Sequence, residues 1–209
     1  MDFELIAVVG GPARTAMQVR KKDTGEIFMM KAPDKENLIE QTFTLQKIQH
    51  PFIVGLHYAF ETSDKLYLIL DFLSGGELFF HLQREGKFDE VRSRFYIAEI
   101  GLALGHVHSQ NFIYRNLNPE YAVLDKFGHV CLTDIIGLTN TKFPDYLAPE
   151  CLMGVGHGKA VDWWSLGILL FEMLNGLPPF YSDNASEMDE LILHEPLNFT
   201  EEFSQEARN

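Results

Sequence analysis

Residues 112–138 decide the fold of this chain, and they read FIYRNLNPEYAVLDKFGHVCLTDIIGL. An apolar strand start leads into a polar loop, and a glycine turn separates the two apolar runs that follow. The expected elements are a strand start at 112–114, an apolar run at 122–124, a turn at 125–128 and a strand at 129–133. Strands that reverse over this turn bring the loop residues Arg115, Asn116 and Asn118 close to the acidic end of the last strand.

Length and composition indicate a folded protein with one large or two small domains. The 209 residues are 46% hydrophobic and include 17 phenylalanines, which excludes a disordered chain. The formal net charge of −13 argues against binding to nucleic acid or to anionic membranes, because both need a basic face. We interpret this charge mainly as an aid to solubility.

Cysteine usage and the N-terminus favour a cytoplasmic location. The cysteines Cys131 and Cys151 form neither a disulfide framework nor a zinc-binding pattern, so a reducing compartment fits best. The first residues lack the basic and long apolar regions of a signal peptide. The longest apolar run is too short to cross a bilayer, so no membrane span is expected.

Hydrophobic periodicity predicts a strand-rich first part and a helical second part. Strands are expected over 3–9, 16–20, 27–31, 56–60 and 65–70, with a helix over 38–48. Residues 71–76 have the composition of a linker. Helices are expected over 77–84, 90–109, 162–175 and 187–194.

The central stretch resembles the catalytic and metal loops of eukaryotic protein kinases, whose motifs read H-R-D-L-x-x-x-N and D-F-G. The corresponding segments are YRNLNPEY at 114–121 and DIIG at 134–137. Further matching words are MQVRKKDT at 17–24, GGELF at 75–79, YLAPE at 146–150, AVDWW at 160–164 and GLPPF at 176–180. Together they are similar to the AGC serine/threonine kinases, closest to fungal homologues of serum/glucocorticoid-regulated kinase and Akt.

The resemblance implies a single bilobal protein-kinase domain of the α+β class over residues 1–209. A small lobe of five antiparallel strands and one helix is expected at 1–70, a hinge at 71–76, and a larger, mainly helical lobe, truncated at its C-terminal end, at 77–209. Only ten residues, 138–147, separate the DIIG glycine from Ala148, which is short for an activation segment.

The resemblance also shows which catalytic groups are replaced. The position of the general base holds Asn116, whose amide cannot accept a proton, and loss of a general base costs ~10²–10⁴-fold in rate. The phosphate-neutralising lysine is replaced by Asn118, and the second magnesium ligand by Tyr121. Asp134 remains as a ligand for one Mg²⁺, although DIIG has one residue more than D-F-G; the alternative is an ordinary aspartate at a strand end.

The nucleotide-binding groups implied by the resemblance are Gly10, Lys31, the backbone of Asp71 and Leu73, Glu77, and Val123. The segment GGPAR at 10–14 departs from G-x-G-x-x-G, because Pro12 lacks an N–H donor, so a plain hairpin turn is favoured there. The glutamate partner of Lys31 is replaced by Gln41, so we expect an unpaired lysine that faces solvent.

Other side chains have two interpretations each. Met29 replaces the alanine above the adenine ring, and core filling is favoured over ligand contact. Glu77 and Glu120 match acidic residues that contact ribose or basic substrates in the family, or they are solvated charges. Asp162 resembles a buried aspartate that supports the catalytic loop through its backbone.

These departures predict a pseudokinase, a kinase-shaped domain that binds a protein such as a related kinase or its client. ATP and Mg²⁺ are expected to bind weakly or not at all. One alternative is a weak ATP-dependent serine/threonine kinase that uses Lys31 and Asp134 with one Mg²⁺. The other is a truncated kinase copy that folds poorly.

Overall fold

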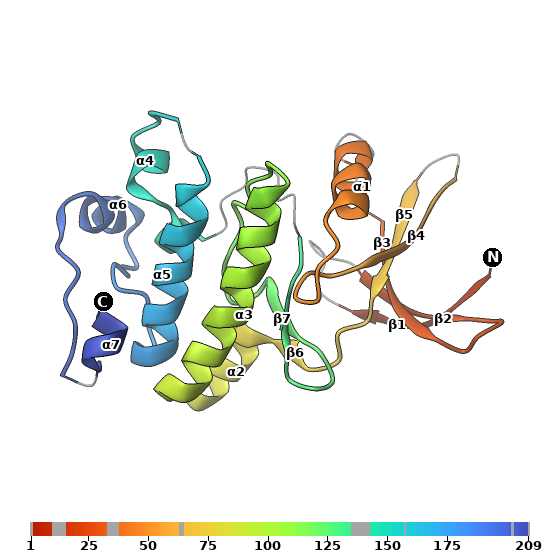
Figure 1. Ribbon diagram of the computed structural model, residues 1–209, viewed down its shortest axis with the longest axis horizontal. Coiled ribbons are helices and arrows are strands. Elements are labelled where there is room, and N and C mark those ends of the chain that lie inside the picture. Colours follow the sequence, from red (N-terminus) through yellow and green to blue (C-terminus); the bar gives the residue numbers. More distant parts are fainter. Residues whose placement is uncertain are drawn as a thin grey trace.

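The computed structural model describes residues 2–9, 16–32, 38–62, 65–134, 143–156, 158–201 and 203–208; at 38–41 and 43 it describes the backbone. Within this part, the chain forms a sheet-rich small lobe and a helical large lobe, with the two ends of the chain at opposite ends of the molecule (Figure 1). The α+β class and the five-stranded antiparallel sheet predicted from the sequence are confirmed.

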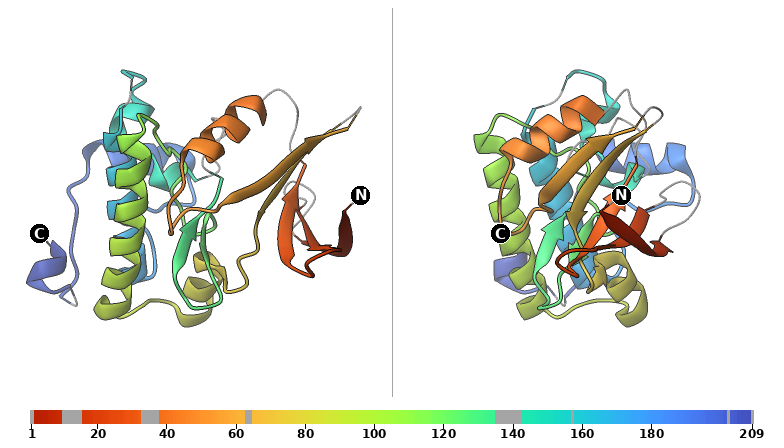
Figure 2. Two further views of the ribbon diagram at one scale, coloured as in Figure 1. Left: turned by 45° about the vertical axis from the view of Figure 1, so that its right-hand side comes forward. Right: turned by 90° about the vertical axis from the view of Figure 1, so that its right-hand side faces the viewer.

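The small lobe is an antiparallel sheet with one helix beside it. Its strands are β1 (Phe3–Val9), β2 (Ala16–Lys21), β3 (Ile27–Lys31), β4 (Leu56–Glu61) and β5 (Leu66–Asp71), in the spatial order β1-β2-β3-β5-β4. Helix α1 (Leu38–Lys47) packs near β4, as both views in Figure 2 show. A glycine at φ 75°, Gly25, makes the tight turn between β2 and β3.

The sheet is curled so far that its two edges approach each other. Phe3 of β1 stacks on Phe60 of β4 with ring centroids 6.2 Å apart, although these strands lie at opposite edges. The ring of Phe3 also meets that of Phe28 edge-on. The right-handed twist of a sheet accumulates over five strands and allows this closure. A small separate core therefore lies on this face of the sheet.

The large lobe is built around two long helices. Helices α3 (Glu90–Ser109) and α5 (Ala160–Asn175) run side by side (Figure 1). The remaining helices are α2 (Leu78–Glu85), α4 (Pro149–Leu152), α6 (Ala185–His194) and α7 (Gln205–Arg208), with a 3₁₀ turn at Pro144–Tyr146. Helix α5 ends at Gly176, whose left-handed φ of 95° suits a glycine C-cap.

A second small sheet and its contacts join the two lobes. It contains β6 (Gly76–Glu77), β7 (Ala122–Leu124) and β8 (Val130–Leu132). The backbone of Leu132 in β8 accepts a hydrogen bond from Val54 N (3.0 Å) and donates one to Phe52 O (2.9 Å). The main hydrophobic core runs through both lobes. The strand that ends next to Asp134 is therefore fixed to the small lobe.

The predicted strand start at 112–114 is wrong. The Phe112 N–H bonds to Val107 O (3.2 Å), at the end of α3, and the Tyr114 N–H bonds to a side chain, Asp162 Oδ2 (2.8 Å). These donors are therefore not available to a strand ladder.

Candidate active site

The loop at 114–121 is held in place by a buried carboxylate. Asp162, in the first turn of α5, is 0% exposed. Its oxygens accept hydrogen bonds from the backbone N–H groups of Tyr114 (2.8 Å) and Arg115 (2.6 Å). The imidazole of His108 lies 2.6 Å from Asp162 Oδ2. Support of the loop through its backbone, which the sequence predicted for Asp162, is confirmed. Arg115, whose N–H bonds to this carboxylate, has a left-handed φ of 63°.

Tyr114 ties this loop to the strand before Asp134. Its side chain is 1% exposed, and its hydroxyl donates a hydrogen bond to the carbonyl of Thr133. Burial, with added repulsion from the nearby carboxylates Asp134 and Asp162, raises the pKa of Tyr114 well above its ordinary value. The phenol therefore stays protonated and donates. Sequence reasoning missed this contact, although a buried tyrosine hydroxyl generally finds a partner.

Asn118 is a structural residue of the loop. The side chain is 1% exposed, and its Nδ2 donates to the carbonyl of Asn116 (2.8 Å). Its Oδ1 accepts from the backbone N–H groups of Glu120 (2.9 Å) and Tyr121 (3.1 Å). This is a turn stabilised by an asparagine side chain. Both ends of the amide thus bond to the backbone of its own loop, and Asn118 carries no positive charge for a phosphate.

Asn116 stands at the position of the general base, and Tyr121 stands at that of the second magnesium ligand. The side chain of Asn116 is half-buried and carries an amide where the kinase motif has a carboxylate. The ring of Tyr121 meets that of Phe143 edge-on, with centroids 6.2 Å apart. The carbonyl of Tyr121 accepts hydrogen bonds from Thr133, at N (2.9 Å) and Oγ1 (3.1 Å). These bonds place the loop beside the residue that precedes Asp134.

Lys31 and Asp134 form an ion pair. Lys31 Nζ lies 3.2 Å from Asp134 Oδ1, and the two side chains are 34% and 39% exposed. The expectation that Lys31 is unpaired is therefore wrong, and its side chain is only partly exposed to solvent. Backbone hydrogen bonds tie Leu132 of β8 to the segment before β4, and Asp134, two residues after Leu132, lies close to Lys31 at the end of β3. Asp134 has a left-handed φ of 55°.

Comparison with known proteins decides the family. A family profile described as "Protein kinase domain" matches residues 8–209. The chain belongs to the protein kinase family. It is 52% identical to "Protein kinase 2" of Dictyostelium discoideum over 100% of this chain and 48% of the relative. It is 49% identical to the "RAC family serine/threonine-protein kinase homolog" of that organism over 100% of this chain and 52% of the relative.

Human and yeast relatives place the kinase domain in the AGC class, as expected. Identity is 46% to human "Serine/threonine-protein kinase Sgk2", over 94% of this chain and 59% of the relative. It is also 46% to "Serine/threonine-protein kinase gad8" of Schizosaccharomyces pombe, over 99% of this chain and 40% of the relative. The chain thus spans about half the length of these kinases. The alignment with the first Dictyostelium relative covers 229 positions, more than the 209 residues of this chain, so that relative has residues in the matched region that this chain lacks.

The donor set does not fit the magnesium site of a kinase. Mg²⁺ takes an octahedral set of oxygen ligands and is usually held by carboxylates and phosphates. Here the Oδ1 of Asp134 faces an ammonium at 3.2 Å, the amide of Asn118 is used by the loop, and Tyr121 offers a phenol. In the part of the chain that the structure describes, no group of three or more His, Cys, Asp or Glu could hold a metal ion.

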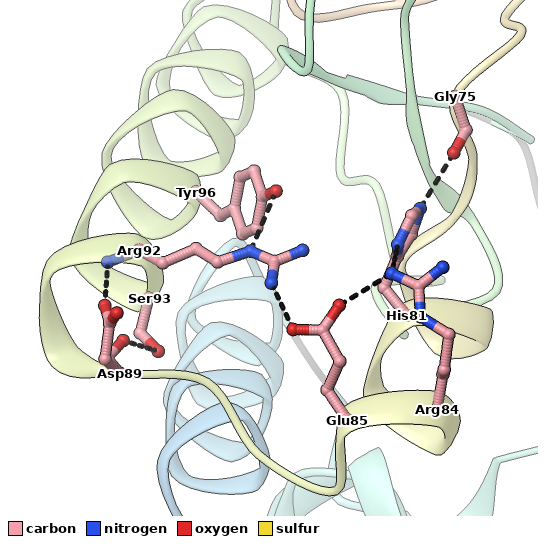
Figure 3. Close-up of polar contacts among 8 residues, drawn as sticks. All are labelled: Gly75, His81, Arg84, Glu85, Asp89, Arg92, Ser93 and Tyr96. Carbon is pink, nitrogen blue, oxygen red and sulfur yellow. Dashed lines mark hydrogen bonds and ion pairs between the residues drawn. The ribbon is translucent and has the colours of Figure 1, made fainter.

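The linker at 71–76, expected to form the hinge, is connected to the large lobe by a series of polar contacts (Figure 3). The carbonyl of Gly75 lies 2.8 Å from His81 Nε2, and Arg84 Nη2 lies 3.3 Å from His81 Nδ1. Arg84 also bonds to Glu85 (2.8 Å), which in turn bonds to Arg92 of α3 (2.6 Å). The geometry requires a histidine whose Nε2 carries the proton, because a carbonyl accepts there and a guanidinium donates to Nδ1. The network thus connects the hinge to α2 and α3.

The expected nucleotide contacts lie along the hinge and β7. Glu77 pairs with Val123 in the β6–β7 ladder, so these two are brought together. Asp71 ends β5; its N–H donates to the carbonyl of Gly55 (3.1 Å), and its carboxylate accepts from Gly55 N (2.6 Å). The N–H of Asp71 is therefore not available to an adenine. Leu73 is half-buried in the linker.

Met29 packs against the main core, which agrees with its interpretation as core filling. Gly10 and the rest of the glycine loop lie outside the described residues, as do 135–137 of DIIG and residues 138–142 of the activation segment. The side chain of Gln41 also lies outside the description. None of the helices in the described part is long and apolar enough to cross a membrane.

Proposed function

We propose that this AGC kinase domain is a pseudokinase, which has lost phosphotransfer and serves as a protein-interaction module. One observation carries the proposal: the position of the catalytic base holds the amide of Asn116. An amide has no basicity near neutral pH, so it cannot take the proton of a substrate hydroxyl. Loss of a general base lowers the rate by ~10²–10⁴-fold.

Two further features support this proposal through separate physical effects. Phosphoryl transfer depends on positioning and on neutralisation of charge around the phosphates. Asn118 supplies no positive charge, and both ends of its amide bond to the backbone of the loop. Asp134 is paired with Lys31, so the carboxylate for a metal and the ammonium for the phosphates neutralise each other.

The partner in this proposal is a protein, such as a related kinase or its client, that binds the helical lobe. Nucleic acid is not a partner in this scheme, because the net charge is −13. We place this function in the cytoplasm. Both cysteines, Cys131 and Cys151, are free thiols, and burial raises the pKa of Cys131 to about 12, so this thiol is unreactive.

A second candidate is a weak serine/threonine kinase that uses Lys31 and Asp134 with one Mg²⁺. The names of the relatives favour it, since proteins 46–49% identical to this chain are called serine/threonine-protein kinases.

A phosphotransfer assay decides between the two. The chain is incubated with Mg²⁺, ATP and a basic peptide, and phosphate on the peptide and on the chain is measured by mass spectrometry, with the kinase domain of human Sgk2 as the active control. We expect no transfer above the level of the Asp134→Ala variant. Transfer that this substitution abolishes would establish the weak kinase. A cooperative thermal transition of the purified chain would exclude a poorly folding copy.

A further inference from the structure

The ion pair between Lys31 and Asp134 uses the two charged groups on which nucleotide binding in a kinase site depends. It joins β3 to the end of β8, 103 positions apart in the sequence, with Nζ and Oδ1 at 3.2 Å. Both side chains are about one-third exposed, so a polyphosphate approaching from solvent reaches them. The ligand must then compete with Asp134 for Lys31.

The neighbouring side chains determine whether Mg²⁺ can bind Asp134 and so release Lys31 for the phosphates. In a site with two strong metal ligands, Mg²⁺ draws the carboxylate away from the lysine and bridges it to the phosphates. Here the position of the second metal ligand carries Tyr121, a bulky phenol whose ring packs against Phe143. A single carboxylate that is already paired is a poor site for an ion that gives up its water reluctantly.

We infer that any nucleoside polyphosphate bound at this site binds without a metal ion, and that Asp134 opposes this binding instead of supporting it. This inference deepens the proposed pseudokinase function, on which it rests. The physical reason is charge: Asp134 holds Lys31 and also repels the phosphates. For two unit charges about 6 Å apart, Coulomb's law at the dielectric of bulk water, about 80, corresponds to about a threefold change in affinity, and the lower dielectric near a protein surface makes the change larger.

The substitution Asp134→Asn should therefore change nucleotide affinity in the opposite direction from its effect in a magnesium-dependent site. In a magnesium-dependent site, Asp134→Asn removes a metal ligand and weakens nucleotide binding. In the site described here, the same isosteric change frees Lys31 and removes the repulsion, so it strengthens binding. Lys31→Met removes the attracting charge and should weaken binding in either case.

The chain offers a matched control for the ion pair. Lys21 and Asp23 form a lysine–aspartate pair of similar length, 3.1 Å, in the turn region after β2. Asp23→Asn removes one carboxylate and breaks one lysine pair, as Asp134→Asn does, but at a different place. It lowers the net negative charge of the chain equally, so it also controls for the overall electrostatic field.

The experiment is isothermal titration of the whole chain with ATP, in EDTA and in excess Mg²⁺, with inorganic tripolyphosphate and adenosine as separate ligands. We expect ATP to bind in EDTA at least as tightly as in Mg²⁺. Asp134→Asn should tighten binding of ATP by at least about threefold, Asp23→Asn should leave it unchanged, and Lys31→Met should weaken it. Tripolyphosphate should show the same order of variants with lower affinity, and adenosine should bind equally to all of them.

Other results would overturn the inference. These are binding that requires Mg²⁺, binding that Asp134→Asn weakens, or no binding of ATP at millimolar concentration by the chain and by Asp134→Asn. Each variant is first melted without ligand, and an unchanged transition shows that the fold is intact. The phosphotransfer assay is a separate measurement, so absence of nucleotide binding would remove this inference and leave the proposed pseudokinase function in place.

Discussion

Substitution of Asp162 is the sharpest test of how the catalytic loop is held. The carboxylate is 0% exposed and accepts hydrogen bonds from the N–H groups of Tyr114 and Arg115 at 2.8 and 2.6 Å, with His108 at 2.6 Å. Asp162→Ala leaves all these donors buried without an acceptor. Each unsatisfied donor costs about 1–3 kcal/mol, and removal of one partner of a buried pair costs about 3–5 kcal/mol. We therefore expect Asp162→Ala to lower the free energy of unfolding by about 3–5 kcal/mol.

Urea denaturation followed by tryptophan fluorescence measures this loss. With a slope of about 2 kcal/mol per molar urea, the midpoint should fall by about 1.5–2.5 M. Asp162→Asn keeps one acceptor oxygen and should lose less. Glu190→Ala is the control, because Glu190 pairs with a histidine too, His194 at 3.5 Å, but both side chains are about 70% exposed. This exposed pair should contribute less than about 0.5 kcal/mol. A loss below about 1 kcal/mol for Asp162→Ala would refute the role of this carboxylate.

Three further predictions concern pH and backbone space. Burial raises the pKa of Glu172 to about 7, so the folded state binds the extra proton between pH 4.5 and 7 and loses stability as the pH rises through this range. Glu172→Gln should therefore melt higher than the parent at pH 8, and an equal or lower melting temperature would contradict this. Burial, with repulsion from His106, lowers the pKa of His50, so the free energy of unfolding should fall as the pH drops below 6.5. The variant His50→Asn should show a smaller fall between pH 7 and pH 5.5 in urea denaturation. A Cβ on Gly75 would lie 2.5 Å from a backbone carbonyl, so Gly75→Ala should lose more than about 1 kcal/mol. Gly105→Ala, in open space on α3, should instead gain up to about 1 kcal/mol, and a similar effect at both sites would disprove the packing argument.

The sequence alone determined the secondary structure well where the hydrophobic pattern was regular. Strand β1 at Phe3–Val9 and helix α3 at Glu90–Ser109 have the predicted bounds, because apolar periodicity and turn residues act within a short window. It missed the short β6 at Gly76–Glu77, whose pairing with β7 depends on residues far along the chain. The wrong strand start at 112–114 has a related cause, since Asp162 takes up a donor there.

Some features of the candidate site follow from the sequence alone, and others depend on the tertiary structure. The amide of Asn116 is a property of one side chain, so its lack of basicity follows from the sequence whatever the fold. The partner of Lys31 does not follow from the sequence, because Asp134 lies 103 positions away and meets the lysine only in the folded chain. The hydrogen bonds of Asn118 to its own loop likewise depend on the folded backbone. The residue types thus fixed which charges are missing, and the tertiary structure decided which of the remaining charges meet, because contacts across the chain depend on long-range packing.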